Sequence, residues 1–270
     1  MANISVLMSV YYKEKPEYLK ESLASLENQT LKANEIVIVK DGPLTNELDA
    51  TINEFKKTYD GNVIIVPLEQ NQGLGLALRE GLLHCSNEII ARQDSDDISI
   101  PTRFEIEFNE IQKGYDIVGS HINEFINTTD NVVSKRVVPL TEKEIIAYQK
   151  KRCALNHMTV MFKKSKVLEA GNYEHCPLME DDMLWVRMIL VHAKMKNIDD
   201  FLVYARVGED MFRRRGGYAY FKKYKSARKK IYKLGFISFF QYLETNIIQF
   251  IVCIMPNSLR QFIFVKLLRK

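Results

Sequence analysis

The first 93 residues alternate between short apolar runs and segments with helical periodicity, and this alternation constrains the fold more than any other feature of the sequence. Apolar runs rich in β-branched residues occupy 4–10, 35–42, 62–68 and 88–93. Between them, apolar residues recur at helical spacing in 16–29, 46–59 and 76–85. Strands that alternate with helices predict βαβ units around a parallel sheet. Because the strands are continuously apolar, helices are expected on both faces.

The rest of the chain contains the same kinds of element in a looser order. Further strands are expected at 115–126, 158–164 and 200–207, and a helix at 180–193. A chain of 270 residues, with 46% hydrophobic and 27% charged residues, is able to bury the core of one large α/β domain. The N-terminus has no basic segment followed by an apolar one, so no signal peptide is expected. The four cysteines form no CxxC pair, which favours a reduced, cytoplasmic setting.

The net charge of +4 conceals two parts of opposite sign. Residues 211–270 contain 14 Lys or Arg and one acid, Glu244, and therefore carry +13. Residues 1–210 contain the other 24 basic residues and 33 acidic residues, and therefore carry −9. The sequence thus predicts an acidic body (1–210) and a basic tail (211–270), and the charge of the tail indicates an anionic partner.

The basic tail interleaves Lys and Arg with aromatic residues at 213–236, and an apolar run follows at 236–255. Five polar residues interrupt that run: Gln241, Glu244, Thr245, Asn246 and Gln249. A membrane-spanning helix needs about 20 mostly apolar residues, so helices that lie in the interface of an anionic membrane are expected instead. The alternative is a helical subdomain that folds against the body. Nucleic acid is not expected as a partner, because no recognition motif accompanies the charge.

Three aspartates, Asp94, Asp96 and Asp97, follow the fourth predicted strand within four residues. Carboxylates this close repel one another near a folded core unless a cation lies among them. Their oxygens are ligands that Mg²⁺ or Mn²⁺ accepts, usually together with substrate phosphates. The alternative is a capping loop, in which Asp97 or Ser99 caps a helix that begins near Pro101.

Other polar residues are expected at the same edge of the sheet, because ligands bind beyond the carboxyl ends of parallel strands. Asp41 follows the second strand and either forms a turn with Gly42 or binds a ligand. Gly73 and Gly75 follow the third strand and are expected to form a tight turn. Arg79, one turn into the next helix, either pairs with a diphosphate or is solvated.

A second acidic cluster, Glu180 to Asp182, begins the helix expected at 180–193. The helix dipole favours acids in a first turn, but one of them is also placed to act as a general base. Trp185 lies four residues after Asp181 on the same helix face, and is either part of the core or the floor of a sugar site. His157 precedes a predicted strand, where a lone histidine is more often structural than catalytic.

Six segments together resemble a glycosyltransferase of family 2, which has the GT-A fold. The resemblance covers about residues 3–215 and is specific because the segments occur in order and at the spacing of the family. Within the family, the chain looks most similar to bacterial transferases that build surface polysaccharides of the amylovoran and capsule type. The segments are ISVLMSVYYKEKPEYLKESLASLENQT, EIVIVKDG, NQGLGLALREGL, ARQDSDDISIPTRFE, NHMTVMFKKSKVLEAGNY and MEDDMLWVRM.

The resemblance implies a donor site for a nucleotide sugar, usually a UDP-sugar. It places Asp41 on the uracil, Asp94 near the ribose and Asp96 on the Mn²⁺ or Mg²⁺ ion that bridges the diphosphate. Lys40 stands where the family usually has an acid, which leaves the contact with the base less defined. The same nucleotide-sugar site is expected to include Tyr11, Arg79 and Ser95.

The resemblance also implies that Asp181 is the catalytic base, with Glu180, Trp185 and His157 as candidates for the acceptor or sugar site. The metal and Arg79 would stabilise the charge on the leaving diphosphate, while Asp181 takes the proton of the acceptor hydroxyl. Attack from the face opposite the leaving group inverts the anomeric carbon. The motif QxxRW of processive synthases is absent, so one sugar is expected per encounter. A polyprenyl-diphosphate-linked acceptor at the inner face of the cytoplasmic membrane would suit the basic tail.

Two other functions compete with this interpretation. A sugar-nucleotide pyrophosphorylase should have a glycine-rich, basic loop after the first strand, but SVYYKEKPEY contains no glycine. A non-catalytic scaffold of a polysaccharide assembly complex would not need Asp96 and Asp181, and both are present.

Overall fold

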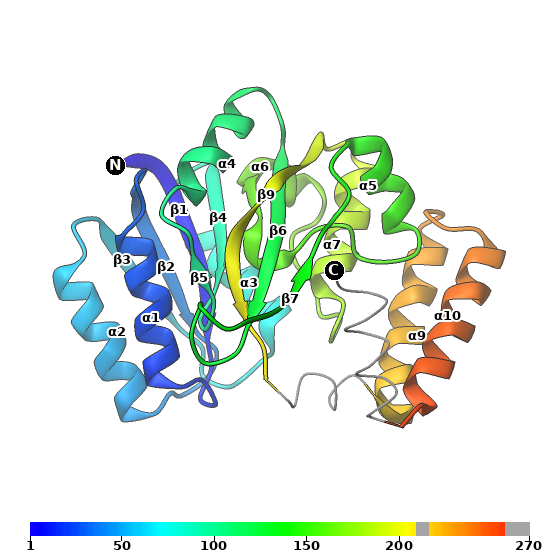
Figure 1. Cartoon of the computed structure of the whole chain (residues 1–270), viewed down its shortest axis with the longest axis horizontal. Helices are drawn as coiled ribbons and strands as arrows, with labels where there is room; N and C mark the ends of the chain where they lie inside the picture. The colour runs from blue at the N-terminus through cyan, green and yellow to red at the C-terminus, as the bar shows by residue number, and fades with distance from the viewer. Residues whose placement is uncertain (209–215, 257–270) are drawn as a thin grey trace.

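The computed structural model describes residues 1–208 and 216–256, and this part of the chain contains one nine-stranded sheet with helices on both faces (Figure 1). The strands follow the order β3-β2-β1-β4-β8-β6-β9-β5, and β7 pairs with β6. Helices α9 and α10 stand side by side at one end of the molecule, beyond α7 (Figure 1).

The first half of the sheet consists of the predicted βα units. β1 pairs in parallel with both β2 and β4, and β2 pairs in parallel with β3. The parallel sheet expected from the alternation is therefore confirmed. The elements are β1 (Ala2–Val10), α1 (Pro16–Glu27), β2 (Ala33–Lys40), α2 (Asn46–Thr58), β3 (Asn62–Pro67), α3 (Leu74–His84) and β4 (Ile89–Asp94).

The second half of the sheet is mixed. β8 is antiparallel to both β4 and β6, whereas β6 and β9 are parallel. The short β5 and the hairpin strand β7 pair antiparallel with β9 and β6. The elements are β5 (Ile98–Ser99), α4 (Arg103–Gln112), β6 (Ile117–Phe125), β7 (Val132–Arg136), α5 (Glu142–Gln149), a 3₁₀ turn (His157–Thr159), β8 (Met161–Lys163), α6 (Lys164–Glu169), α7 (Glu180–Leu190) and β9 (Met195–Arg206).

Each strand of the parallel half sends alternate side chains to two separate cores. On β1, Leu7 packs with α3 and α7, while Val6 and Met8 pack with α1 and α2 on the other face. All three side chains are fully buried. Successive side chains of a strand point to opposite faces, so a strand covered on both sides must be apolar throughout. This confirms the explanation given for the continuous apolar runs.

The capping prediction for the loop after β4 is wrong. The residue before α4 is Thr102, and its side chain makes no capping hydrogen bond. Ser99 belongs to β5, where it pairs with β9, and its hydroxyl donates to Gln93 Oε1 at 2.8 Å. Asp97 Oδ1 accepts a hydrogen bond from the backbone N–H of Arg206 at 2.8 Å. Both side chains therefore form hydrogen bonds within the sheet and its loops, and neither caps α4.

The described part of the basic tail is a pair of helices, α9 (Gly217–Lys233) and α10 (Phe239–Ile254), that packs against α7. Ala227 and Ile231 of α9 share a buried apolar cluster with Met183 and Val186 of α7. Between 216 and 256, the alternative of a helical subdomain folded on the body is therefore the one observed. Residues 209–215 and 257–270, with their basic side chains, lie outside the described residues. Neither α9 nor α10, nor any other described helix, is both long and apolar enough to cross a membrane.

Candidate active site

The carboxyl ends of β1, β2 and β4 bring the predicted site residues to one edge of the sheet. Ser9 of β1 is in register with Asp94 at the end of β4, and Val10 is in register with Lys40 at the end of β2. Tyr11 follows β1 directly, and its side chain is exposed. The expected convergence of distant segments at this edge is therefore observed.

Asp41 braces the loop that leads into α3. Its Oδ1 accepts from the N–H of Gln72 at 2.7 Å, and its Oδ2 accepts from the N–H of Gly73 at 3.0 Å and from Asn71 Nδ2 at 2.9 Å. Gly42 forms the adjacent turn with φ +85°, and a Cβ there would lie 2.7 Å from Asn71 N. Asp41 is thus a buried structural residue, and three of its acceptor positions are already in use.

The aspartate loop after β4 is held by protein cations as well as by hydrogen bonds. Asp94 forms an ion pair with Arg92, two residues earlier on the same strand. Arg206, at the end of β9, donates from Nε to the carbonyl of Asp96 at 3.1 Å. Burial, followed by the charges of Asp94 and Glu14, raises the pKa of Asp96 to about 7. The carboxylates therefore still repel one another in the folded chain.

Of two further donor-site candidates, Ser95 belongs to this loop, whereas Arg79 lies on α3 near Asn172. Ser95 is buried, and its hydroxyl donates to Glu14 Oε2 at 2.5 Å. Arg79 is exposed on α3, and it forms no ion pair with any residue of 1–208 or 216–256. Its carbonyl accepts from Asn172 Nδ2 at 3.2 Å. The guanidinium of Arg79 is therefore available for an anion.

The second acidic cluster forms the first turn of α7, beside the aspartate loop. Burial and the charge of Asp181 raise the pKa of Glu180 to about 7. Burial also raises the pKa of Asp181, although Arg136 and Arg92 act in the opposite direction. Asp182 faces inward, where its carboxylate accepts a hydrogen bond from Gln149. A half-buried carboxylate with a raised pKa is suited to accept a proton near neutral pH.

Arg92 connects the two acidic clusters, a role that its position two residues before Asp94 does not by itself predict. It is 1% exposed, and its Nε and Nη1 have no hydrogen-bond partner among the described residues. Its charge lowers the pKa of Asp97 in one cluster, and the pKa values of Glu180 and Asp181 in the other. A buried guanidinium therefore provides the positive charge around which both sets of carboxylates gather.

His157 and Trp185 lie in the packed layer behind the site. His157 Nε2 is 2.9 Å from the hydroxyl of Tyr173, and burial together with Arg92 lowers the histidine pKa well below its usual value. The histidine is thus neutral. Trp185 is fully buried, and its ring lies 5.8 Å from the His157 ring in an edge-on arrangement. Of the alternatives for Trp185, the structure shows the core residue.

The carboxylates at this edge do not form a metal cage by themselves. No group of three or more His, Cys, Asp or Glu residues that could hold a metal ion occurs in the described ranges. Asp96 nevertheless offers hard oxygen atoms in a region with excess negative charge. Such a donor set fits Mg²⁺ or Mn²⁺ when a diphosphate supplies the remaining oxygens.

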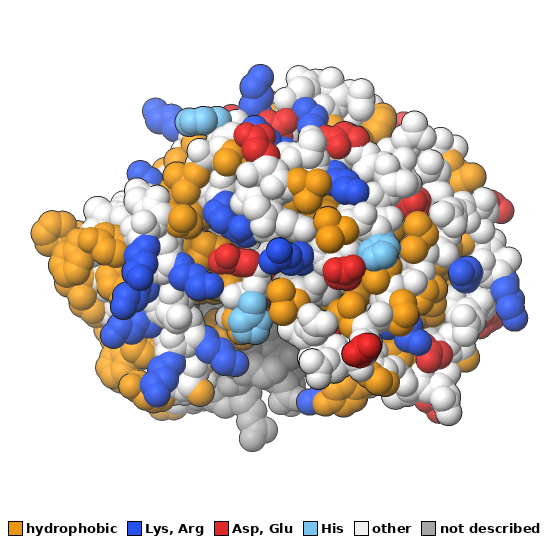
Figure 2. Space-filling view, turned by 180° about the vertical axis from the view of Figure 1, so that it is seen from behind, with side chains coloured by type: hydrophobic (Ala, Val, Ile, Leu, Met, Phe, Trp, Pro, Cys, Tyr) orange, Lys and Arg blue, Asp and Glu red, His pale blue; other side chains and the backbone are white. Residues whose placement is uncertain are grey.

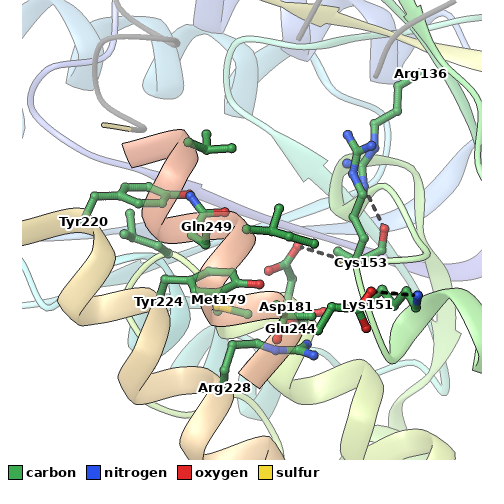
Figure 3. A pocket seen from close by; sticks show the side chains of 16 residues that line it. Arg136, Lys151, Cys153, Met179, Asp181, Tyr220, Tyr224, Arg228, Glu244 and Gln249 are labelled. Atoms are coloured by element: carbon green, nitrogen blue, oxygen red, sulfur yellow. Dashed lines mark hydrogen bonds and ion pairs between the residues drawn. The ribbon is translucent and has the colours of Figure 1, made fainter. Parts of the chain in front are cut away.

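A cavity of about 360 Å³ opens beside Asp181 (Figure 3). One wall comes from β7 and from the turn after α5, through Arg136, Lys151 and Cys153. The opposite wall comes from α9 and α10. The Cys153 thiol contacts Asp181 Oδ2 at 3.7 Å, so the candidate base lies at the boundary between the body and the helical pair.

Comparison with known proteins agrees with this geometry. Residues 5–168 match the family model described as glycosyl transferase family 2. An uncharacterized glycosyltransferase of Haemophilus influenzae is 41% identical over 268 residues, which are 98% of this chain and 99% of the relative. The amylovoran biosynthesis glycosyltransferase AmsE of Erwinia amylovora is 36% identical over 97% of this chain and 98% of its own. The UDP-Gal:alpha-D-GlcNAc-diphosphoundecaprenol beta-1,3-galactosyltransferase of Escherichia coli is 34% identical over 98% and 96%.

Solved structures share the fold at low sequence identity. The structure of S. aureus TarS 1–349 in complex with UDP-GlcNAc superposes with a TM-score of 0.64 at 16% identity, and the match covers 97% of this chain and 70% of that one. The mannosyltransferase PcManGT from Pyrobaculum calidifontis, in complex with GDP-Man and Mn²⁺, gives a TM-score of 0.63 at 13% identity, over 86% and 64%. The fold is therefore GT-A, and the chain belongs to glycosyltransferase family 2.

Proposed function

We propose that this glycosyltransferase moves a sugar from a UDP-sugar to a hydroxyl of a lipid-linked glycan, with inversion, during the synthesis of a bacterial surface polysaccharide. The observation that carries the proposal is the pair of acidic clusters around the buried Arg92, which forms an ion pair with Asp94 and whose charge opposes the rise in the pKa of Asp181. In the cluster after β4, Asp96 suits the metal ion that would accompany the donor diphosphate. In the cluster at the start of α7, Asp181 suits the acceptor hydroxyl, whose proton it would accept. The names of the relatives in Erwinia amylovora and Escherichia coli support the polysaccharide and the lipid-linked acceptor.

On the donor side, Asp96 would hold the divalent ion, with Asp94 and Ser95 beside it and Arg79 near the diphosphate. The ion supplies charge stabilisation for the leaving nucleoside diphosphate. Tyr11 is exposed at the end of β1, where its ring would contact the nucleobase, while the buried Asp41 would hold the neighbouring loop in place. The complex of PcManGT with Mn²⁺ supports a divalent metal at a GT-A donor site.

On the acceptor side, Asp181 takes the proton of the attacking hydroxyl, and Glu180 lies beside it at the start of α7. The hydroxyl attacks the anomeric carbon from the face opposite the diphosphate, so an α-linked donor gives a β-linked product. The name of the Escherichia coli relative describes a UDP-Gal donor and a β-1,3 linkage, which supports a β-linked product.

We further propose that the enzyme works on the inner surface of the cytoplasmic membrane and docks there through its helical pair. Apolar side chains of α10 stay exposed in a row along the outer side of the molecule, next to a band of lysines (Figure 2). Such a surface suits the interface of an anionic membrane, where a lipid-linked acceptor is found.

Thermal stability and donor hydrolysis test the donor side of the proposal. The purified chain would be measured with UDP-glucose, UDP-galactose, their N-acetyl forms and GDP-mannose, each with Mn²⁺ and with EDTA. Stabilisation by one donor that requires Mn²⁺ and disappears in Asp96→Ala is expected. Asp60→Ala is the matched control, because this acid is exposed on the loop before β3, at the opposite edge of the sheet. If no nucleotide changes the melting temperature or is hydrolysed, the scaffold alternative gains.

A further inference from the structure

The cavity beside Asp181 contains more positive charge than its acids neutralise. Four cations line it, and two of them have local partners: Lys151 Nζ lies 3.1 Å from Glu244 Oε1, and Arg228 lies near Asp182, whose pKa its charge lowers. The other two are Arg136 and Arg152. Neither forms an ion pair with a carboxylate anywhere in residues 1–208 or 216–256.

Arg136 and Arg152 are close enough for their charges to interact. Burial lowers the pKa of Arg152, and the charge of Arg136 lowers it as well. Arg136 donates from Nη2 to the carbonyl of Cys153 at 2.8 Å, which fixes its guanidinium at the rim of the cavity (Figure 3). Asp181 and Asp182 partly offset Arg136, whose charge opposes the rise that burial causes in their pKa values. Arg152 forms no ion pair in the described ranges, and two guanidinium groups this close are costly to hold together unless an anion binds between them.

The floor of the cavity supplies a third, deeper guanidinium. Arg228 of α9 is 1% exposed, and its Nη2 donates to the carbonyl of Lys150. Its Nε is buried without a hydrogen-bond partner in the described part of the chain. A buried donor without a partner is unusual in a folded protein. Arg228 thus adds a further positive charge to the lining of the cavity.

The wall formed by the helical pair combines polar residues, such as Glu244 and Gln249, with the apolar Ile248 of α10. Ile248 and Leu178, which precedes α7, line the cavity and are also partly exposed to solvent. A ligand with an anionic end and an apolar end would match the arginines and this apolar edge at once. Its apolar end could leave the cavity along the exposed side chains of α10, such as Ile247 and Ile251.

We propose that this cavity binds the phosphate or diphosphate group through which the acceptor glycan is attached to its lipid, with Arg136 and Arg152 as the anion-binding pair. The inference rests on the proposed function and identifies how the acceptor is recognised. Arginine suits this task because its planar fork makes two parallel hydrogen bonds to phosphate oxygens. With the anion held there, the attached sugar lies next to Asp181, at the opening between the two walls.

The experiment compares two soluble acceptor probes: an N-acetylglucosaminyl diphosphate with a short alkyl tail, and the alkyl glycoside of the same sugar without a diphosphate. Wild type is expected to bind the diphosphate probe at least about tenfold more tightly, and Arg152→Gln is expected to abolish most of that difference. Arg136→Gln should also reduce the difference in affinity between the two probes. Arg152→Lys, which keeps the charge but not the planar fork, should retain part of that difference. Lys225→Gln, on the exposed side of α9, is the control and should change neither affinity.

A second arm distinguishes the two possible sources of a diphosphate. If the cavity binds the acceptor, the affinity for UDP with Mn²⁺ stays at the wild-type value in Arg152→Gln. If UDP binding falls as much as probe binding does, the cavity serves the donor and the inference is wrong. Equal affinity of wild type for both probes would also overturn it. A chain that binds neither UDP nor either probe would instead count against the proposed function, and the melting temperature of each variant shows whether it is folded.

Discussion

Arg92 and Asp94 face the same side of β4 and form an ion pair in which the arginine is almost fully buried and the aspartate reaches solvent. Residues two apart on a strand share a face, so this pair is built into the strand itself. The pair brings a positive charge beneath the candidate donor site. The same charge reaches Glu180 and Asp181 on α7, and it therefore links the two halves of the site.

Removing this charge should impair proton acceptance by Asp181. In Arg92→Met, the pKa of Asp181 rises because a nearby positive charge is lost, so the acid limb of the pH–rate profile moves to higher pH. At neutral pH the turnover number is then expected to fall about tenfold. Arg92→Lys keeps a positive charge, so its acid limb and its turnover number should be much closer to those of wild type. An acid limb that stays at the wild-type pH in Arg92→Met would refute the link between the two acidic groups.

Removing Glu180 should have the opposite effect. The negative charge of Asp181 raises the pKa of Glu180, and the repulsion between two carboxylates acts on both of them. In Glu180→Gln, Asp181 therefore loses its proton at a lower pH, and the acid limb moves down. Initial rates between about pH 5 and 9, at saturating donor, measure this shift. Movement to higher pH, or complete loss of activity at every pH, would show that Glu180 and not Asp181 accepts the proton.

The parallel half of the sheet could be predicted from the sequence, whereas the short strand β5 could not. Apolar runs and helical periodicity are local signals, and they identify the parallel half of the sheet, because each βα unit repeats one pattern. β5 has only two residues, too few for a pattern, and it exists because Ile98 and Ser99 pair with β9 more than a hundred residues later. The capping alternative, in which Asp97 or Ser99 caps the next helix, is wrong for the same reason, since Ser99 pairs with Val203 of the distant β9.

The helical pair illustrates a second limit. In KSARKK, Arg228 is one cation among several, and nothing local shows that it turns inward while Lys229 and Lys230 stay exposed. Its burial follows from the packing of α9 on α7, which depends on the tertiary fold. Acids at the end of β4 and the start of α7 were identified from their place in the pattern. That Arg206 binds the loop of Asp96, and that Arg92 also acts on Asp181 of α7, becomes apparent only when distant segments meet.

Asp182 should make the stability of the chain depend on pH. Burial, together with Asp181, raises its folded-state pKa to about 7 from an ordinary value of 3.8. Between these two values the folded state binds the proton and the unfolded state does not, so the free energy of unfolding falls as the pH rises through this window. Asp182→Asn removes the ionisation, and at pH 8 it should be more stable than wild type by about 1 to 3 kcal/mol.

Chemical denaturation at pH 5 and pH 8 tests this expectation. The advantage of Asp182→Asn over wild type should be larger at pH 8 than at pH 5. Asp60→Asn is the control, because the Asp60 carboxylate is 75% exposed in its contact with Lys32 and should give no such change. A variant that is less stable than wild type at both pH values would show that Asp182 is held ionised by its neighbours Arg228 and Gln149.

Membrane docking should depend on the outer face of α10. Phe240 is 80% exposed and Ile247 is 51% exposed, on a helix that stands at the rim of the molecule (Figure 1). The double variant Phe240→Ser and Ile247→Ser should bind vesicles that contain phosphatidylglycerol at least about tenfold more weakly, because each apolar side chain gains free energy in the interface. Leu83→Ser, an equally exposed leucine on α3, is the control. High salt should also weaken the binding of wild type to these vesicles, since the lysines of α9 contribute through their charge. Equal binding of the double variant and the control would contradict docking through α10.

Gly75 sets the distance between α3 and the first turn of α7. A Cβ at this position would lie 2.8 Å from the carbonyl oxygen of Glu174 and 3.0 Å from Glu180 Cβ. Gly75→Ala must therefore displace the segment that carries Glu180 and Asp181, and a fall in turnover number of about tenfold is expected, with a loss of about 1 to 3 kcal/mol in stability.

Gly81→Ala is the matched control on the same helix. Its Cβ would lie 2.6 Å from Leu7 Cδ1, on the side of the sheet, so it should lower stability without changing the turnover number of the folded enzyme. Equal turnover numbers in the two variants, measured where both are folded, would show that the contact between α3 and α7 only supports the fold and does not position the base.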